Sequence, residues 1–334
     1  MPDVLEGLSE ELQSKIERRA QPKWTQPMLA TLTDDRFSDP DWIYERKLDG
    51  VRCLVFSKNG RIRLMSRNER EMNETWPDLV EELEENQEQS FIADGEIVAF
   101  EGNKTSFSRL QQRIGVEEAS KARKTRVRAY LYLFDLLHVE QHDITKLPLR
   151  QRKQLLKETV SFSGHVRYTP HRNEDGEAYL KEACRKGWEG LIAKDARAAY
   201  EHKRSKKWLK FKCVHQQELV IGGFTDPQGS RVGFGALLTG YYEDGELRYS
   251  GKVGTGYDDE LLKSLRKRLD RLERKTSPFD EDVSEKNVHW VTPELVGEFG
   301  FTEWTRKGRL RHPRFLGLRK DKDAKDVHRE RAGG

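Results

Sequence analysis

The pattern of the chain changes near Cys213, and this change most limits the folds that it can adopt. Before it, apolar segments typical of strands alternate with segments typical of helices, such as 149–159. After it, short strand-like segments follow one another between glycine-containing turns, with one helix expected over 258–273. Because 334 residues are also too many for one ordinary domain, the sequence predicts two.

We expect an N-terminal extension over 1–22 and an α+β domain over 23–213, made of antiparallel sheets and helices. A small β-barrel of the oligonucleotide-binding (OB) type, with a basic C-terminal tail, is expected over 214–334.

Composition excludes several classes of protein. Hydrophobic residues make up 35% of the chain, enough for a packed core, and charged residues another 35%. No segment approaches the ~20 apolar residues that span a bilayer, and no signal peptide is apparent, so we expect a cytoplasmic protein without membrane contact. The three cysteines, Cys53, Cys184 and Cys213, match no zinc pattern and are expected to be free thiols.

Lys47 lies in the segment KLDGVR, between a strand-like segment and an Asp-Gly turn. A surface hairpin explains this pattern about as well as a catalytic role does. A lysine nucleophile must lose its proton, so its pKa would have to fall from about 10.4. Burial and nearby cations such as Arg46 and Arg52 would lower it.

Three further segments carry polar or aromatic residues in places that need an explanation. The carboxylates of Asp94 and Glu96 interrupt the apolar segment FIADGEIVAF, which costs free energy unless they are paired or bind metal. Arg67, in SRN, is by itself most often a solvated side chain. Phe134, in LYLFDLL, is by itself most often a core residue.

Two more segments indicate a phosphate site. In EGLIAK, Glu189 opens a buried strand expected over 188–194 and Lys194 ends it. In WLKFK, alternation places Lys210 and Lys212 on one strand face and Leu209 and Phe211 on the other. Two adjacent lysines repel unless an anion lies between them, which favours a bound phosphate. No Walker-type phosphate loop is present, so side chains would have to hold the phosphates.

Taken in the order in which they occur along the chain, these six segments resemble the motifs of the ATP-dependent DNA ligases of the covalent nucleotidyltransferase superfamily. RHPRFLGLRKDK resembles the last motif of that family, and GKVGTGYDDELLKSL is similar to the ligase module of bacterial end-joining ligases. The resemblance covers 27–322 and implies a nucleotidyltransferase (adenylation) domain followed by an OB-fold domain. No polymerase or phosphoesterase segment is seen.

The resemblance implies a role for each matching position. Lys47 would take the AMP. Ten positions would bind the nucleotide: Glu45, Arg52, Arg67, Glu96, Phe134, Arg204, Lys210, Lys212, Arg319 and Lys322. Among them, Glu45 would contact the adenine amino group, Phe134 would stack on the ring, and the last two would orient the pyrophosphate. Glu96 and Glu189 would hold Mg²⁺ or Mn²⁺.

The implied function is ATP-dependent sealing of 3′-OH/5′-phosphate nicks in duplex DNA through a lysyl-AMP intermediate, in repair or end joining. We expect a nucleoid-associated monomer, with a Ku-type end-binding protein as a candidate partner. Basic segments at 121–128 and 306–331 are candidate DNA contacts. The alternatives are an RNA ligase, a capping-type nucleotidyltransferase, or a non-catalytic nick-binding protein. Nucleotide choice and nick type separate the first two from a DNA ligase, and the third would bind nicked duplex without needing Lys47.

Overall fold

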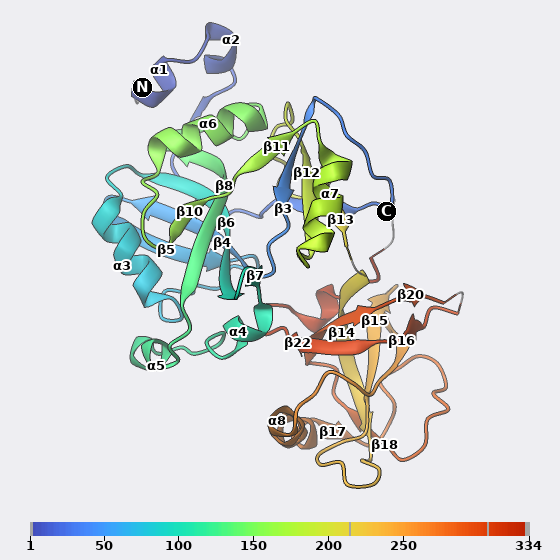
Figure 1. Ribbon diagram of the computed structural model, residues 1–334. Helices are drawn as coiled ribbons and strands as arrows, with labels where there is room; N and C mark the ends of the chain where they lie inside the picture. Colours follow the sequence, from blue (N-terminus) through green and yellow to red (C-terminus); the bar gives the residue numbers. More distant parts are fainter. Residues whose placement is uncertain (1–2, 214, 306, 331–334) are drawn as a thin grey trace. The chain divides into compact units, whose positions relative to one another are not determined.

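The computed structural model in Figure 1 describes residues 3–213, 215–305 and 307–330. The described residues form two compact units, 3–213 and 215–330, called unit 1 and unit 2 below. In this part of the chain, no helix is both long enough and apolar enough to cross a membrane.

The larger sheet of unit 1 forms around long antiparallel strands. Its path is β1 (Glu17–Arg18), β9 (His142–Asp143), β8 (Ala129–Val139), β6 (Phe91–Glu101), β4 (Val51–Lys58) and β5 (Arg61–Ser66). Two short strands extend it: β10 (Val166–Tyr168) pairs with β8, and β7 (Lys104–Thr105) pairs with β6.

One face of this sheet packs on helices and forms the largest core of unit 1. The helices are α3 (Pro77–Asn86), α4 (Phe107–Gln111) and α6 (Leu149–Thr159), and they contribute leucines such as Leu79, Leu110 and Leu156 to that core. The N-terminal segment, with α1 (Asp3–Glu6) and α2 (Glu10–Gln13), adds the fully buried Leu5. Between α4 and α6, the chain also forms the short helix α5 (Ala119–Lys124).

The smaller sheet of unit 1 has five strands. Its order is β11 (His171–Asn173), β3 (Trp42–Arg46), β12 (Gly190–Asp195), β13 (Arg204–Lys212) and β2 (Leu29–Leu32). Helix α7 (Gly176–Arg185) covers one face, where Tyr44, Leu191 and Phe211 pack with its Tyr179. The other face shares a core with the larger sheet, because Trp208 packs in one cluster with Leu54, Ile92 and Phe134.

Unit 2 is built on β14 (His215–Thr225), which pairs with three strands. These are β15 (Leu237–Glu243), β18 (Val288–Val291) and β19 (Val296–Phe301). Beyond them lie β16 (Glu246–Val253), β17 (Glu273–Arg274) and β22 (Arg314–Leu318), while β20 (Glu303–Trp304) pairs with β21 (Leu310–Arg311). Helix α8 (Asp259–Asp270) corresponds to the helix expected over 258–273, and a short 3₁₀ helix covers Ala324–Asp326.

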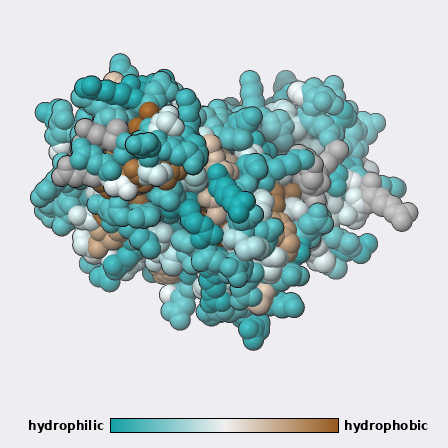
Figure 2. All heavy atoms as spheres, turned by 90° about the horizontal axis from the view of Figure 1, so that it is seen from above, coloured by the Kyte–Doolittle hydropathy of each residue, from teal (hydrophilic) through white to brown (hydrophobic). Residues whose placement is uncertain are grey.

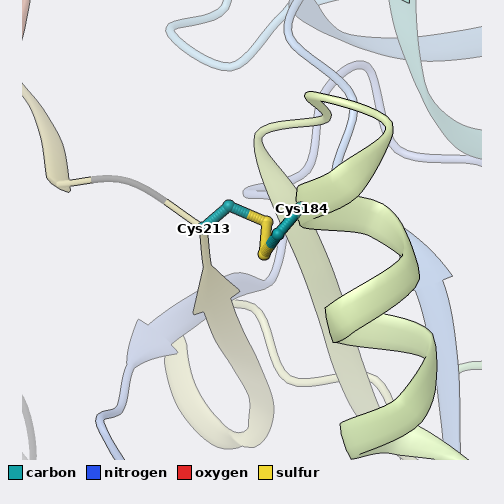
Figure 3. Close-up of a disulfide and its surroundings, with 2 residues drawn as sticks. All are labelled: Cys184 and Cys213. Carbon is teal, nitrogen blue, oxygen red and sulfur yellow. A yellow bond between two sulfur atoms is a disulfide. The ribbon is translucent and has the colours of Figure 1, made fainter.

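The expectation that all cysteines are free thiols is wrong for two of them. Cys184, in α7, and Cys213, just after β13, form a disulfide with their Cα atoms 5.3 Å apart (Figure 3). Cys53 is free and buried. The pairing depends on how α7 packs on the sheet, and the spacing of 29 residues gives no sign of it.

This disulfide should make the stability of unit 1 sensitive to reductants. A cross-link that closes a loop of 29 residues restricts the unfolded chain, and the chain-entropy model gives about 3–4 kcal/mol for it. We expect a dithiol reductant to lower the thermal midpoint of the wild type. The double variant Cys184→Ser/Cys213→Ser should unfold at this lower midpoint with or without reductant. An unchanged wild-type midpoint would contradict the prediction.

Candidate functional site

The face of the smaller sheet that shares its core with the larger sheet carries several of the charged residues predicted for the site. Ile192 of β12 pairs with Glu45 on one side and with Lys210 on the other. Cross-strand partners project to the same face, so these two side chains lie in one row of that face. In the next row, Lys194 pairs with Trp208.

Lys47 directly follows β3 and is held beside the end of β12. Its backbone N–H donates to the carbonyl of Gly190 at 2.9 Å, and Gly190 pairs with Lys212. Gly50, in the turn that follows, has no room for a side chain, because a Cβ there would lie 2.2 Å from the carbonyl oxygen of Ile97. The turn therefore packs directly against β6, and glycine is required.

The Lys47 ammonium forms an ion pair with Glu189, whose side chain is only 9% exposed. Burial, the largest influence, lowers the pKa of Lys47, and Lys212 lowers it further. The Glu189 carboxylate raises it, and the net pKa is raised above its ordinary value. The expected fall in pKa is therefore wrong for this state of the protein, because the group in contact with the amine is an acid.

Arg52, on β4, is bound by the carboxylate of Asp94 rather than exposed toward solvent. Its Nε and Nη2 donate to the two Asp94 oxygens at 2.6 Å each, and Nη2 also donates to the carbonyl of Met28 at 3.0 Å. The Tyr200 hydroxyl donates to the same carboxylate at 2.6 Å. Asp94, fully buried, is thus satisfied by a bidentate pair, which is the pairing that its place in an apolar strand required.

Phe134 is 7% exposed and belongs to the core that the two sheets share. Its ring packs edge-on against Trp208, with the centroids 6.0 Å apart. Two cations lie over it: Arg52 Cζ at 4.7 Å and Lys194 Nζ at 4.1 Å from its centroid. Phe134 is therefore both a core residue and an electron-rich surface at the site, and a base could stack only on a ring face that these cations leave clear.

Glu45 is 2% exposed, and its carboxylate lies between two buried lysines. Lys153 of α6 contacts Oε1, and the Nζ of Lys194 lies 2.6 Å from Oε2. Burial alone would raise the pKa of Glu45, but the two ammonium groups lower it below the ordinary value. The sequence reasoning missed Lys153, although a charge on the buried face of an amphipathic helix is a signal that could have revealed it.

The other unit 1 candidates lie on or beside β6, β5 and β13. Glu96, on β6, is the direct cross-strand partner of Arg52. Arg67 follows the last residue of β5. Arg204 begins β13 and donates to the carbonyl of Ala30 at 2.7 Å.

No metal cluster is preformed in the described part of the chain. Among residues 3–213, 215–305 and 307–330, no group of three or more His, Cys, Asp and Glu side chains could hold a metal ion. Glu96 and Glu189, the two carboxylates predicted to hold the metal, are therefore not part of a preformed cluster, and Mg²⁺ is commonly bound by one or two carboxylates together with substrate phosphates and water.

Arg319 and Lys322 lie in unit 2, just beyond β22. Arg319 forms a bidentate pair with Asp321, at 2.9 and 2.8 Å, and its pKa is raised by this and neighbouring carboxylates despite burial. Lys322 Nζ lies 3.1 Å from Glu218 Oε1. These contacts lie within unit 2.

The basic segments predicted to contact DNA are only partly described. In 121–128, Arg123 pairs with Glu81 and Lys121 pairs with Glu118, so these charges are partly compensated. In 306–331, both end positions, Arg306 and Arg331, lie outside the described residues. The face of the molecule shown in Figure 2 is mainly hydrophilic, in line with the 35% of charged residues.

Comparisons with known proteins identify both units. The family described as "ATP dependent DNA ligase domain" matches residues 27–212, and "ATP dependent DNA ligase C terminal region" matches 230–322. A solved structure titled mycobacterial DNA ligase D complexed with ATP and MES is 32% identical, with a TM-score of 0.66, over 92% of this chain and 98% of that one. The predicted fold class, an adenylation domain followed by an OB-fold domain, is confirmed.

Curated relatives are longer than this chain. The Multifunctional non-homologous end joining protein LigD of Pseudomonas aeruginosa is 36% identical over 94% of this chain and 37% of its own length. The Multifunctional non-homologous end joining DNA repair protein LigD of Mycobacterium tuberculosis (strain H37Rv) is 35% identical over 91% of this chain and 40% of its own length. The chain thus spans about two fifths of the length of these two relatives.

Proposed function

Because the chain belongs to the ATP-dependent DNA ligases, we propose that it seals 3′-OH/5′-phosphate nicks in duplex DNA through an AMP joined covalently to Lys47. The observation that carries this proposal is the position of the Lys47 amine. It lies at the end of β3 against Glu189, beside a sheet face that bears further lysines and a buried carboxylate.

The region around Glu45 and Phe134 has the chemistry to bind adenosine. Glu45 offers a carboxylate, and Phe134 and Trp208 offer ring surfaces in one cluster. Two buried polar atoms here, Trp208 Nε1 and Thr169 Oγ1, have no hydrogen-bond partner among the described residues. Buried polar groups are normally paired, so these atoms support a polar ligand at this place.

The neighbouring cations suit the phosphates. Lys210 and Lys212 share a strand face near Lys47, and we assign Arg52, Arg67 and Arg204 to the ribose and phosphate groups by family resemblance. We assign Arg319 and Lys322 of unit 2 to the pyrophosphate by family resemblance. Glu96 and Glu189 would hold Mg²⁺ or Mn²⁺, which would neutralise charge that develops on the phosphates.

The chemistry starts at the Lys47 nitrogen. An ammonium has no lone pair, so the ion pair with Glu189 must open and the amine must lose its proton before attack. A bond then forms between Nζ and the α-phosphorus of ATP, and pyrophosphate leaves. The AMP passes to the 5′-phosphate of the nick, and the 3′-hydroxyl then displaces AMP to close the strand.

We further propose that the nick arises in end joining or another form of DNA repair, since relatives that this chain resembles are named for end joining. A Ku-type end-binding protein is the proposed partner, and the enzyme would act as a monomer near the nucleoid. Contacts to DNA would be mainly electrostatic, through the segments 121–128 and 306–331, so affinity for nicked duplex should fall as salt rises.

An ATP-labelling experiment tests the proposal. After incubation with α-labelled ATP and Mg²⁺, wild-type protein should keep the label through denaturing electrophoresis, and nicked DNA should then remove it. Protein treated first with pyrophosphate controls for AMP that is already bound. Labelling by GTP but not ATP would indicate a capping-type enzyme, and sealing of RNA nicks alone would indicate an RNA ligase. If neither nucleotide labels the protein, catalysis is refuted and nick binding without chemistry becomes the better explanation.

A further inference from the structure

The charge on Glu45 is set by two lysines that the reaction itself does not use. Glu45, Lys153 and Lys194 each have side chains at most 3% exposed, and each carboxylate oxygen faces one ammonium. A buried carboxyl group without a partner tends to take up a proton. Here the two ammonium groups hold it ionised, and an ionised carboxylate can accept hydrogen bonds but cannot donate one.

Lys153 also fixes the distance between Glu45 and the aromatic ring. Its Nζ donates to the backbone carbonyls of Phe134, at 3.3 Å, and Thr169, at 3.2 Å, in addition to contacting Glu45. One ammonium, with its three protons in use, therefore connects β3, β8 and the segment after β10. The Glu45 carboxylate and the backbone of Phe134 are therefore both held by the Lys153 ammonium.

Lys194 completes the arrangement from the opposite side. Its Nζ lies 4.1 Å from the ring centroids of both Phe134 and Trp208, so it is held by two aromatic faces as well as by Glu45. His171, the cross-strand partner of Glu45, has its pKa lowered to about 4 by burial and by Lys153. It is therefore uncharged near neutral pH and does not compete with the lysines for the carboxylate.

We propose that Lys153 and Lys194 are positioning residues that make Glu45 an obligate hydrogen-bond acceptor and thereby select purines with a 6-amino group over those with a 6-oxo group. This inference rests on the proposed function, in which Glu45 meets the edge of the base. A 6-amino group donates to the carboxylate, whereas a 6-oxo group would set two acceptors against each other. The choice of nucleotide then depends on Lys153 and Lys194, which contact Glu45 rather than the base.

The alternative is that Lys153 has a structural role only and holds α6 against the sheets. The neighbouring Arg152 has such a role, because it forms a fully buried bidentate pair with Asp135, at 2.8 Å for both bonds. Loss of a docking contact would impair the use of every nucleotide by the same factor. Loss of base selection would change the ratio between nucleotides, so the ratio is the informative readout.

The test measures kcat/KM for self-labelling of the protein with ATP and with ITP, which transfer AMP and IMP. The readout is the ratio of the two values, called the ATP/ITP ratio. Glu45→Gln is the reference variant, because an amide can accept from a 6-amino group or donate to a 6-oxo group, and its ratio should approach one. Lys153→Met should lower the ratio by about 10- to 150-fold, the range expected for one hydrogen bond to a charged group. Adding Lys153→Met to Glu45→Gln should lower it no further.

Arg152→Met is the matched control on the same helix, and its ratio should stay at the wild-type value. Lys194→Met, on β12, should lower the ratio independently, which keeps the test valid if Lys153→Met does not fold. An unchanged ratio in both lysine variants would overturn the inference and leave the ligase function intact. A wild-type ratio in Glu45→Gln would show that Glu45 does not read the base. A wild type that neither nucleotide labels would refute the proposed function as well.

Discussion

Lys47→Arg should abolish labelling by α-labelled ATP while leaving the last step of ligation in place. The guanidinium keeps a positive charge for Glu189, so the ion pair that buries this carboxylate is retained. It does not act as a nucleophile because it does not lose its proton in proteins. Loss of a catalytic nucleophile typically costs ~10⁴-fold or more, so the remaining label should be below detection.

The same variant should still seal a nick that already carries AMP on its 5′-phosphate, because Lys47 takes no part in the attack of the 3′-hydroxyl. Lys47→Ala is the comparison, since it also leaves Glu189 without its cation and should be less stable than Lys47→Arg. Covalent label on Lys47→Arg would refute the assignment of the nucleophile. Failure of both variants on pre-adenylylated DNA, with the fold intact, would show that Lys47 has an additional role.

Local structure could be predicted from the sequence where the spacing of apolar residues matches the buried face of a helix or strand. Helix α6 has the predicted bounds, 149–159, and in β13 the apolar Leu209 and Phe211 pack with α7 as the alternation required. Both results follow from local periodicity, which determines which side of an element is buried.

Partners distant in the sequence could not be predicted in the same way. Arg152 and Lys153 stand at the third and fourth positions after Leu149, on the buried side of α6, so the pattern marks them as unusual. Glu45, however, is 108 residues away from Lys153, and only the packing of α6 on the sheets brings the two together. The Lys47–Glu189 pair and the Cys184–Cys213 disulfide escaped prediction for the same reason.

The second large effect is expected at Asp94, through stability as well as activity. Asp94→Asn keeps the shape of the side chain but removes the charge of the carboxylate that pairs with the Arg52 guanidinium. Removing one partner of a buried ion pair typically costs 3–5 kcal/mol, and we expect about 3 kcal/mol here because the Arg52 side chain is still 20% exposed. Self-adenylylation should fall together with stability. Urea unfolding measures the loss of stability, and labelling by α-labelled ATP measures the loss of self-adenylylation.

Glu81→Gln is the surface control, because it breaks the exposed pair with Arg123 and should cost less than about 1 kcal/mol. The double variant Arg52→Met/Asp94→Leu then separates stability from function. An apolar pair of similar volume often restores the stability of a buried ion pair, so this variant should be more stable than Asp94→Asn, although the Tyr200 hydroxyl and the Met28 carbonyl lose their partners. It should still fail to label, since the guanidinium proposed to hold the nucleotide is gone. Labelling that returned along with stability would show that Arg52 serves the fold alone.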